Sequence, residues 1–485
     1  MSNKIYPIGI QNFEKIRNDG YFYIDKTALM YQMVKTGSYY FLSRPRRFGK
    51  SLLISTLEAY FQGKKELFEG LAVEKLEKDW IKHPILHLDL NIEKYDTPES
   101  LDKILNDNLE YWESQYGTRP SETSFSLRFA GIIQRACEKT GQRVVILVDE
   151  YDKPMLQAIG NEELQKQFRN TLKPFYGALK TKDGYIKFAL LTGVTKFGKV
   201  SVFSDLNNLD DISMWNEYVE ICGVSEREIH ENLEAELHEF AAARGITYDK
   251  LCEDLRECYD GYHFTHNSIG MYNPFSLLNA FKRKEFGSYW FETGTPTYLV
   301  KLLKKHHYDL ERMAHEETDV QVLNSIDSES TNPIPVIYQS GYLTIKGYDE
   351  EFGMYRLGFP NREVEEGFIR FLLPFYANVN KVESPFEIQK FVREVRSGDY
   401  NSFFRRLQSF FADTTYEVIR DQELHYENVL FIVFKLLGFY TKVEYHTSEG
   451  RIDLVLQTDK FIYIMEFKLN GTCLLYTSDA ADDLI

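Results

Sequence analysis

Cysteine is scarce in this sequence, and no stretch is apolar enough to suggest a membrane span. Five cysteines occur in 485 residues, none in a Cys-x-x-Cys pair or at zinc-ligand spacing with the 11 histidines. This pattern excludes a disulfide-stabilised secreted scaffold and indicates free thiols in a reducing compartment. No apolar run approaches about 18 residues, and the N-terminus lacks the basic-then-apolar order of a signal peptide. We therefore expect a cytoplasmic protein without membrane contact.

The overall composition is that of a folded globular protein with an excess of acidic side chains. Hydrophobic residues make up 43% of the chain and charged residues 27%. The length allows roughly two to four domains, each with its own core. The net charge of −16 argues against a surface that binds nucleic acid throughout, but it leaves room for a local basic groove.

Residues 43–51, Ser-Arg-Pro-Arg-Arg-Phe-Gly-Lys-Ser, have the features of a phosphate-binding loop. They follow the apolar run 39–42 and precede the segment 52–61, which has apolar residues at helical spacing. In such a strand–loop–helix, backbone N–H groups face the phosphates, while the lysine reaches the β/γ oxygens and the serine holds Mg²⁺. The expected nucleotide ligands are Arg46, Arg47, Phe48, Gly49, Lys50 and Ser51, with Ser51 also a metal ligand.

Arg44 occupies the position at which most phosphate-binding loops have a glycine. The alternative interpretation of the segment is a basic turn that caps a helix, because Arg44, Arg46 and Arg47 would suit any anion. A second motif is needed to decide between these interpretations.

The second motif is the apolar run 144–148, which ends in Asp149 and Glu150. A continuous apolar run of this length is typical of a parallel strand buried on both faces. Acids at its carboxyl end lie where open α/β sheets bind ligands. We predict that Asp149 orients Mg²⁺ and that Glu150 polarises an attacking water. An acidic turn in solvent is the alternative for this motif alone, but the two motifs in this order favour an α/β NTPase fold.

Two further strands are expected around these motifs. Residues 85–91 alternate and come between the motifs in the chain, which is typical of additional-strand NTPases with a catalytic glutamate. Residues 186–193 form a fourth apolar strand, and a polar residue at such a strand end commonly senses the γ-phosphate. Thr192 and Thr195 are the candidates, with an ordinary turn as the alternative. The possible cationic fingers are Arg169, Lys196 and Lys199.

Together these segments resemble the AAA-ATPase-like family of bacterial proteins, which often carry a C-terminal PD-(D/E)XK nuclease-like domain. The matching residues are Arg-Pro-Arg-Arg-Phe-Gly-Lys-Ser at 44–51, Val-Asp-Glu-Tyr-Asp-Lys-Pro at 148–154, Leu-Thr-Gly-Val-Thr-Lys-Phe at 191–197, and segments 203–209, 259–264 and 272–275. The family usually has arginine in place of the first loop glycine. The resemblance implies ATP binding by a parallel sheet with helices on both faces. It also includes Asp152, for which a helix cap before Pro154 is the alternative.

The expected organisation has four parts. They are an AAA-like ATPase core at 1–215, a helical lid and winged-helix-like region at 216–375, a nuclease-like domain at 376–471 and a non-native tail at 472–485. Aromatic residues of the segment 1–38 either pack in the core or flank the nucleotide base.

The lid is expected to begin with a helix from Ser225, capped by Ser225 and Glu228, that stops at Gly245. Residues 339–345 and 355–357 suggest a hairpin after helices. A winged helix that binds DNA, one that acts as a lid and one that forms an interaction surface would look the same in sequence. We therefore assign this region no nucleic-acid role.

A second candidate site lies near the C-terminus. Residues 450–456 and 461–468 alternate around a polar turn and read as a hairpin. If Thr458 and Asp459 form a two-residue loop, Asp453 lies opposite Ile464 and shares a face with Glu466 and Lys468. Mg²⁺ would take Asp453 and Glu466 as ligands, and Lys468 would orient or activate water.

The Asp-x(12)-Glu-x-Lys spacing of this site resembles the PD-(D/E)XK nuclease core, in an α/β restriction-endonuclease-like domain. Acid-x-Lys on an exposed strand is the alternative. Glu423, at the start of the preceding helix, is either a further acid of the site or a favourable helix N-terminal charge.

The chain departs from the family after Gly471. Relatives continue with a helix and a further strand, whereas residues 472–485 resemble translated sequencing-adaptor sequence. We therefore expect a truncated nuclease-like core with an exposed sheet edge.

The sequence favours an ATP-hydrolysing module coupled to a Mg²⁺-dependent nuclease-like domain that acts on DNA or another nucleic acid. The alternative is a nucleotide-dependent switch or protein-remodelling ATPase whose C-terminal domain is not catalytic. A homo-oligomer is compatible with either hypothesis.

Overall fold

The computed structural model describes residues 4–196, 203, 206, 208–292, 297–324, 332–377, 379–380, 383–411, 419–448 and 451–468. The chain divides into two compact units. Unit 1 comprises residues 1–306 and 312–365, and unit 2 comprises residues 307–311 and 366–485. The boundary at Glu365 falls inside helix α17 (Arg362–Tyr376).

Unit 1 is built on a five-stranded parallel sheet with the order β2-β3-β4-β1-β5. The strands are β1 (Tyr39–Ser43), β2 (Ile85–Asp89), β3 (Val144–Asp149), β4 (Ile186–Gly193) and β5 (Asp210–Asp211). All four strands expected from the sequence are present. The strand that separates β1 from β3 in the sheet is β4, whereas β2, which lies between them in the chain, pairs with β3 alone.

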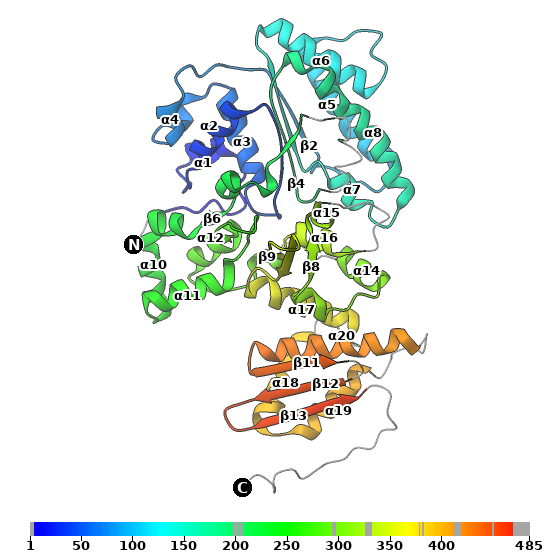
Figure 1. Cartoon of the computed structure of the whole chain (residues 1–485). Coiled ribbons are helices and arrows are strands. Elements are labelled where there is room, and N and C mark those ends of the chain that lie inside the picture. The colour runs from blue at the N-terminus through cyan, green and yellow to red at the C-terminus, as the bar shows by residue number, and fades with distance from the viewer. Residues whose placement is uncertain are drawn as a thin grey trace. The chain divides into compact units, whose positions relative to one another are not determined.

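Helices cover both faces of this sheet, which is why β3 is buried along its whole length (Figure 1). They are α1 (Phe13–Asn18), α2 (Thr27–Thr36), α3 (Lys50–Phe61), α4 (Ala72–Leu76), α5 (Pro98–Tyr116), α6 (Phe125–Thr140), α7 (Lys153–Gln157) and α8 (Glu162–Thr181). α1–α4 lie on one side of the sheet, and α5, α6 and α8 lie on the other. This arrangement is the α/β fold of a P-loop NTPase that the sequence predicts.

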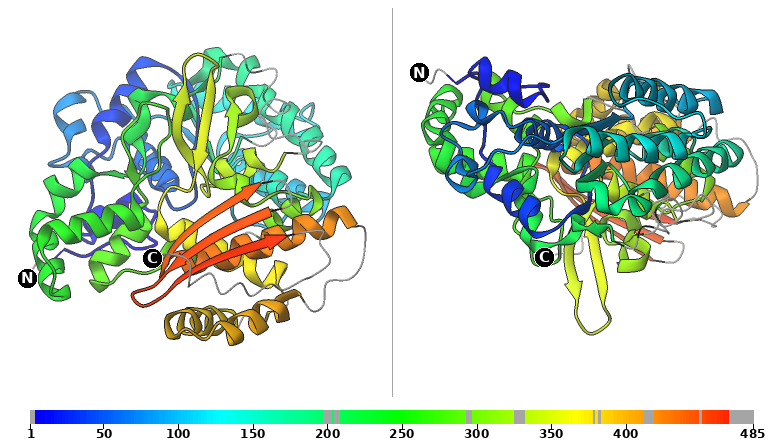
Figure 2. Two further views of the ribbon diagram at one scale, coloured as in Figure 1. Left: turned by 60° about the horizontal axis from the view of Figure 1, so that its bottom comes forward. Right: turned by 90° about the horizontal axis from the view of Figure 1, so that it is seen from above.

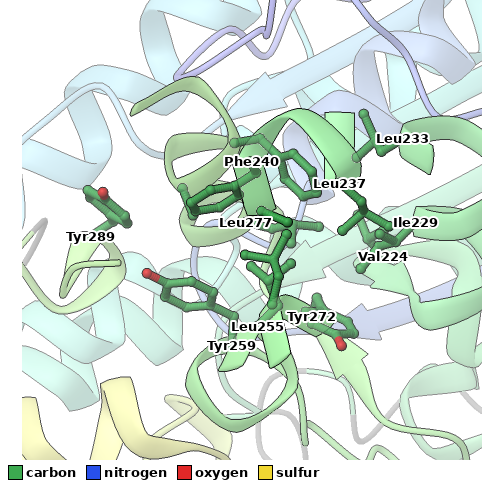
Figure 3. Close-up of a cluster of buried hydrophobic side chains, with 14 residues drawn as sticks. Val224, Ile229, Leu233, Leu237, Phe240, Leu255, Tyr259, Tyr272, Leu277 and Tyr289 are labelled. Carbon is green, nitrogen blue, oxygen red and sulfur yellow. The ribbon is translucent and has the colours of Figure 1, made fainter. Parts of the chain in front are cut away.

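The segment expected to form a helical lid follows the sheet in the chain. It contains β6 (Val224–Ser225), α10 (Glu226–Arg244), α11 (Tyr248–Tyr259), β7 (Met271–Tyr272) and α12 (Pro274–Arg283). The predicted capping box of Ser225 and Glu228 is present, and Gly245 ends α10 at φ 66°. Leucines and aromatic rings of these helices form a common core (Figure 3). Each buried leucine contributes about 2 kcal/mol, so the lid has its own source of stability.

The remainder of unit 1 contains the expected hairpin after helices. Strands β9 (Thr344–Asp349) and β10 (Met354–Gly358) pair antiparallel, and β8 (Glu317–Asp319) extends the sheet at β10. The hairpin is the yellow pair of long strands in Figure 2. The helices of this region are α13 (Tyr289–Glu292), α14 (Thr297–Lys305), α15 (Val320–Asn324) and α16 (Ile334–Gln339).

Unit 2 combines helices with a three-stranded antiparallel sheet of order β11-β12-β13. Its further elements are α18 (Ser384–Ser397), α19 (Tyr400–Phe411), α20 (Ile419–Gly438), β11 (Lys442–Ser448), β12 (Arg451–Gln457) and β13 (Ile462–Lys468). Arg406 of α19 pairs with Glu387 and Glu394 of α18 at 2.5 Å each. The Tyr463 hydroxyl donates to the Val395 carbonyl at 2.8 Å, so α18 lies against one face of the sheet.

Across the described residues, no helix has both the length and the apolar character required to cross a membrane.

Candidate functional site

The predicted nucleotide ligands come together because three parallel strands end at the same edge of the sheet. Ser43, the last residue of β1, is in register with Gly193 of β4, and Val148 of β3 is in register with Leu191. Parallel strands place their carboxyl ends on one side of a sheet. One site at this edge of the sheet is therefore surrounded by the phosphate loop after β1, the acids after β3 and the end of β4.

Lys50 connects the loop with the acidic strand end. It is the first residue of α3 and is 4% exposed. Its ammonium donates to the carbonyl oxygens of Arg44 at 3.0 Å and of Pro45 at 3.4 Å. The same nitrogen lies 3.6 Å from Glu150 Oε1. The ammonium is thus enclosed by its own loop and faces the carboxylate predicted to activate water.

The start of α3 leaves backbone N–H groups for a ligand. Gly49 is its N-cap residue at φ 98°, in the left-handed region that favours glycine, and no side chain caps the helix there. The helix dipole adds positive potential at the same point. The residues present therefore fit a phosphate group.

Asp149 is buried and held by Thr192. The Thr192 hydroxyl donates to Asp149 Oδ1 at 2.5 Å, and Thr192 itself is fully buried. The backbone N–H of Glu150 donates to the same oxygen at 3.1 Å. The strand end of β4 thus orients the acid at the strand end of β3.

Glu150 lies in a conformation that few non-glycine residues adopt. Its φ is 54°, and Arg47 in the phosphate loop has φ 68°. A left-handed conformation costs such residues about 1–2 kcal/mol, and strain of this kind concentrates at functional sites. Burial raises the pKa of Glu150 to about 7; the Lys50 charge opposes this rise, while Asp152 and Asp149 add to it. The carboxylate is therefore a stronger base than an exposed glutamate.

The Asp152 side chain holds the loop after β4. Its Oδ2 accepts the N–H of Thr195 at 2.6 Å and the Thr195 hydroxyl at 2.7 Å. Its Oδ1 accepts the N–H of Val194 at 3.2 Å, and its side chain makes no capping bond to α7. Asp152 is thus the N-cap residue of α7 by position, but its side chain does not cap the helix. Both candidate sensors, Thr192 and Thr195, have their hydroxyls engaged by acids of the β3 end.

Arg44 points into the protein interior and not toward an anion. It is 1% exposed, and its guanidinium donates to the carbonyl oxygens of Ser213 at 2.7 Å and Tyr218 at 3.1 Å. The guanidinium carbon lies 3.9 Å from the centre of the Phe264 ring. Burial lowers the pKa of Arg44 to about 10. The interpretation of Arg44 as an anion ligand is wrong, because backbone carbonyls already surround its charge.

Arg46 and Arg47 also lie over aromatic rings. Arg46 stacks 4.7 Å from the centre of Trp290, and Arg47 stacks 4.8 Å from the centre of Phe275. The Trp290 indole N–H donates to the Arg46 carbonyl at 2.9 Å. Each cation–π contact is worth about 0.5–2 kcal/mol. All three loop arginines are thus held by rings of the segment that follows the sheet.

A glycine brings the hairpin region directly against the phosphate loop. A Cβ on Gly341 would lie 2.5 Å from Pro45 Cβ, and Gly341 has φ 88°. Only glycine permits this approach. The phosphate loop therefore packs against the residues that precede β9.

The remaining predicted residues take different positions. The Phe48 ring is buried against Tyr262 and Phe264, so only the Phe48 backbone is available to a nucleotide. Ser51 is the second residue of α3 and half-buried.

Two of the three candidate cationic fingers belong to the described residues. Lys196 is 5% exposed and pairs with Asp211 at 2.8 Å within unit 1. Arg169 lies on α8, and among the described atoms its buried Nε has no hydrogen-bond partner. Lys199 lies outside the described residues.

The register of the C-terminal hairpin differs from the expected one. Asp453 lies opposite Glu466, and Gln457 lies opposite Ile462, so four residues form the turn. The turn closes because the N–H of Thr458 donates to the Phe461 carbonyl at 2.8 Å, while the Thr458 hydroxyl accepts the N–H of Phe461 at 2.9 Å. The predicted pairing of Asp453 with Ile464 is wrong by two residues.

A shift of two residues preserves the face of the strand. Asp453 and Glu466 are direct register partners, and Lys468 is two residues along β13 on that face. On the same face, Ile464 is 82% exposed and Ile462 is 66% exposed. Glu423 lies within α20, which begins at Ile419. The predicted tail, 472–485, lies outside the described residues.

Several residues of the site have no local sequence signal. Phe264, Phe275 and Trp290 lie in an aromatic-rich region whose rings would be assigned to core packing. Their contact with the loop arginines depends on residues more than two hundred positions apart in the chain. Asp152 was identifiable from its position in the motif after β3. Its hydrogen-bond partners could not be predicted from residue spacing.

The strand order, the phosphate loop and the acids after β3 define a P-loop NTPase of the AAA type. A nuclease-like hairpin in unit 2 accompanies it. Among the described residues, no group of three or more His, Cys, Asp or Glu side chains is placed to hold a metal ion.

Comparisons with known proteins give the family. Residues 7–203 match the family described as predicted AAA-ATPase, and residues 421–480 match the PD-(D/E)XK nuclease superfamily. The chain is 35% identical over 483 residues to a protein of Azotobacter chroococcum mcd 1 described as an uncharacterized protein in the vnfD 5′ region. That alignment covers 97% of this chain and 90% of the relative. The chain therefore belongs to the predicted AAA-ATPase family with a C-terminal PD-(D/E)XK nuclease superfamily domain. No solved structure matches the chain.

Proposed function

We propose that unit 1 binds and hydrolyses ATP with Mg²⁺, and that this activity controls a Mg²⁺-dependent nuclease-like site in unit 2 that acts on nucleic acid. The observation that carries the proposal is the 3.6 Å approach of Lys50 Nζ to Glu150 Oε1 between the phosphate loop and the β3 end. In P-loop NTPases a lysine binds the β/γ-phosphates while a separate residue orients the attacking water, and this approach places candidates for both roles at one site.

The phosphate groups of ATP would lie against the start of α3. The N–H groups after Gly49 bind their oxygens, and Lys50 exchanges the Arg44 and Pro45 carbonyls for the β/γ oxygens. Ser51 and Asp149 would hold the metal ion, and the Thr192 hydroxyl keeps Asp149 in place. When bound, Mg²⁺ neutralises the charge that develops on the phosphate oxygens.

Glu150 supplies the base for hydrolysis. It accepts a proton from water as the water oxygen bonds to the γ-phosphorus and the bond to the β-phosphate oxygen breaks. Its raised pKa suits this role, because a base with a pKa near the working pH removes a proton efficiently.

The adenine base has a candidate pocket beside the loop. A cavity of about 110 Å³ is lined mainly by apolar side chains and by Gly49. Its walls include Phe22 and Ile24 from the N-terminal segment, and Val224 and Leu278 from the lid. Base binding there would close the lid segment onto the phosphate loop. This supports the nucleotide-flanking interpretation of the N-terminal aromatic residues.

In unit 2, Asp453 and Glu466 would hold Mg²⁺ and Lys468 would orient or activate the water that cleaves a phosphodiester. Carboxylates are the ligands that Mg²⁺ prefers. The direct register of Asp453 with Glu466 supports this assignment. A homo-oligomer would allow a cationic finger to come from a second copy.

Nucleotide binding and turnover measured together test the ATPase part. The wild type should bind a fluorescent ATP analogue and release phosphate only with Mg²⁺. Lys50→Ala should lose binding, whereas Glu150→Gln should bind normally and release phosphate about 10²–10⁴-fold more slowly. Equal turnover by Glu150→Gln and the wild type would contradict the role of Glu150. Binding without turnover in the wild type would favour a nucleotide-dependent switch.

A further inference from the structure

Unit 2 contains two cavities near the turn end of its sheet that share lining residues. One cavity, of about 430 Å³, is lined by α17, α18 and Tyr440, and a second, of about 730 Å³, extends to β11 and the 458–459 turn. Arg396 and Tyr440 line both cavities. We call this combined feature the turn-end groove. None of its lining residues belongs to the predicted metal site.

The turn-end groove gathers positive charge in a chain whose net charge is −16. Its ionisable lining residues are Arg370, Arg393, Arg396, Lys442 and a single acid, Asp459. Arg370 is neutralised by Glu366 at 2.5 Å. Among the described residues, neither Arg393 nor Lys442 has an ion-pair partner. Positive charge that no internal acid compensates favours an anionic ligand.

Helix α18 separates its charges between two faces. Phe386, Gln389, Arg393 and Arg396 follow helical spacing and line the groove. The acids Glu387 and Glu394 instead pair with Arg406 of α19. The groove face of α18 therefore presents arginines without the helix's own acids beside them.

Exposed aromatic rings accompany these cations. Phe386 is 59% exposed and Tyr440 is 39% exposed. Arg396 donates to the Tyr440 carbonyl at 2.7 Å, and the Arg370 guanidinium lies 5.9 Å from the centre of the Tyr440 ring. Arginines beside exposed rings suit a strand with alternating phosphates and bases, because the rings stack on bases while the guanidinium groups bind phosphates. An acidic protein segment would use the charges but not the rings.

The strand end of the groove, at Lys442 and Gln457, lies at a defined distance along the sheet from the predicted catalytic positions. Lys442, Gln457 and Ile462 form one register row at the turn end, and Asp453 lies four residues before Gln457 on β12. At about 3.3 Å per residue the separation is about 13 Å. This equals about four nucleotides at roughly 3.4 Å of rise. Exposed Ile464 lies between these two rows on the same face.

We propose that the turn-end groove binds the phosphodiester backbone of a nucleic-acid strand about four nucleotides from the bond held at Asp453 and Glu466. This deepens the proposed nuclease-like function and rests on it for the class of substrate. The groove positions the strand and does not take part in bond cleavage.

Binding of labelled nucleic acid to the full chain tests the proposal. Fluorescence anisotropy is measured over a series of salt concentrations, with Ca²⁺ in place of Mg²⁺. The probes are single-stranded DNA, the corresponding duplex, and RNA of the same sequence. The variant is Arg393→Glu combined with Lys442→Glu, and the control is Arg405→Glu, an exposed α19 residue outside the groove. Phe386→Ala tests the ring separately.

The double variant should weaken binding at least about tenfold and make the slope of log affinity against log salt shallower by about one for each cation removed. Arg405→Glu should bind like the wild type, and all variants should share its melting temperature. Phe386→Ala should weaken single-stranded probes more than duplex. Unchanged affinity and slope in the double variant would overturn the proposal, as would wild-type protein that binds polyglutamate but none of the three probes.

Cleavage assays separate this proposal from the proposed function. If the wild type binds through the groove but cleaves no probe in Mg²⁺, the groove stands and the nuclease assignment fails. If Lys468→Ala abolishes cleavage while the double variant binds and cleaves normally, the nuclease assignment stands and the groove fails.

Discussion

Thr192 and Asp149 join the ends of two adjacent strands through a 2.5 Å hydrogen bond from the threonine hydroxyl to Oδ1 of the acid. β4 lies between β1 and β3, so this bond is made at the centre of the sheet. Through this bond Thr192, the predicted γ-phosphate sensor, holds Asp149, the predicted Mg²⁺ ligand, in place. We infer that Thr192 is a positioning residue for Asp149.

Replacing Thr192 with valine should therefore impair the site without changing its shape. Thr192→Val leaves Asp149 without this donor, and loss of such an outer partner typically costs 10–100-fold in metal affinity or activity. We expect Mg²⁺-dependent ATP hydrolysis to fall by about that factor and to recover partly at high Mg²⁺. Thr192→Ser keeps the hydroxyl and is the matched control. Equal activity of the valine and serine variants would show that the hydrogen bond has no role.

Replacing Arg44 with glycine, the residue most phosphate-binding loops have at this position, should destabilise the protein. Arg44→Gly removes hydrogen bonds to the Ser213 and Tyr218 carbonyls and the contact with Phe264, and it leaves a cavity. We expect the free energy of unfolding to fall by about 3 kcal/mol or more. Urea denaturation measures this value, with Arg119→Gly in an exposed connection as the control. A variant as stable as the wild type would show that the loop tolerates either residue.

Acidic pH should lower the stability of unit 1, because it protonates the Glu77 carboxylate. Burial alone would raise the pKa of Glu77, but hydrogen bonds from Tyr60, the Asp79 and Lys78 backbones and Lys35 hold it at about 2. A carboxylate with a lowered pKa stabilises the folded state above pH 4.5, and this contribution is lost as the pH falls toward 2. Because solvent screens part of this effect, the loss amounts to about 1–2 kcal/mol.

Unfolding free energies measured between neutral pH and pH 3 test this effect. Glu77→Gln should be less stable than the wild type at neutral pH and lose less stability on acidification. Glu66→Gln, at an exposed position, should follow the wild-type curve. Parallel curves for the wild type and Glu77→Gln would exclude Glu77 as a source of acid sensitivity.

Lys468→Ala should separate cleavage from binding in unit 2. We expect phosphodiester cleavage to fall by about 10²–10⁴-fold, the usual effect of removing a group that handles the attacking water. Affinity for nucleic acid should be retained, because the turn-end groove is unaltered. Lys460→Ala in the exposed turn is the control. A nuclease assay and an anisotropy titration on the same preparations give both values, and loss of binding without a change in cleavage would contradict the assignment.

Local patterns predicted the elements that carry the site. The apolar runs that became β1, β3 and β4 are long and end in polar residues, so the positions of Lys50, Asp149 and Thr192 follow from the general behaviour of parallel sheets. The capping box at Ser225 was likewise readable, because all of its partners lie within one turn.

Long-range partners were not predictable in this way. No local pattern links Arg44 with Phe264, and only the folded chain brings them to 3.9 Å. The prediction of the hairpin register was wrong for a related reason. Thr458 closes a four-residue turn through its own backbone and hydroxyl, and turn length cannot be read from alternation. The face shared by Asp453 and Glu466 survived because the error was an even number of residues.

ATP hydrolysis by the wild type and by Lys50→Ala, each with Mg²⁺ and with or without DNA, tests the central claim most directly. We predict turnover by the wild type that rises when DNA is added, and none by Lys50→Ala, because Lys50 links the phosphate loop to Glu150. Turnover in the wild type that DNA does not change would contradict coupling between the ATPase and the nuclease-like domain. Equal turnover by Lys50→Ala would contradict the site itself.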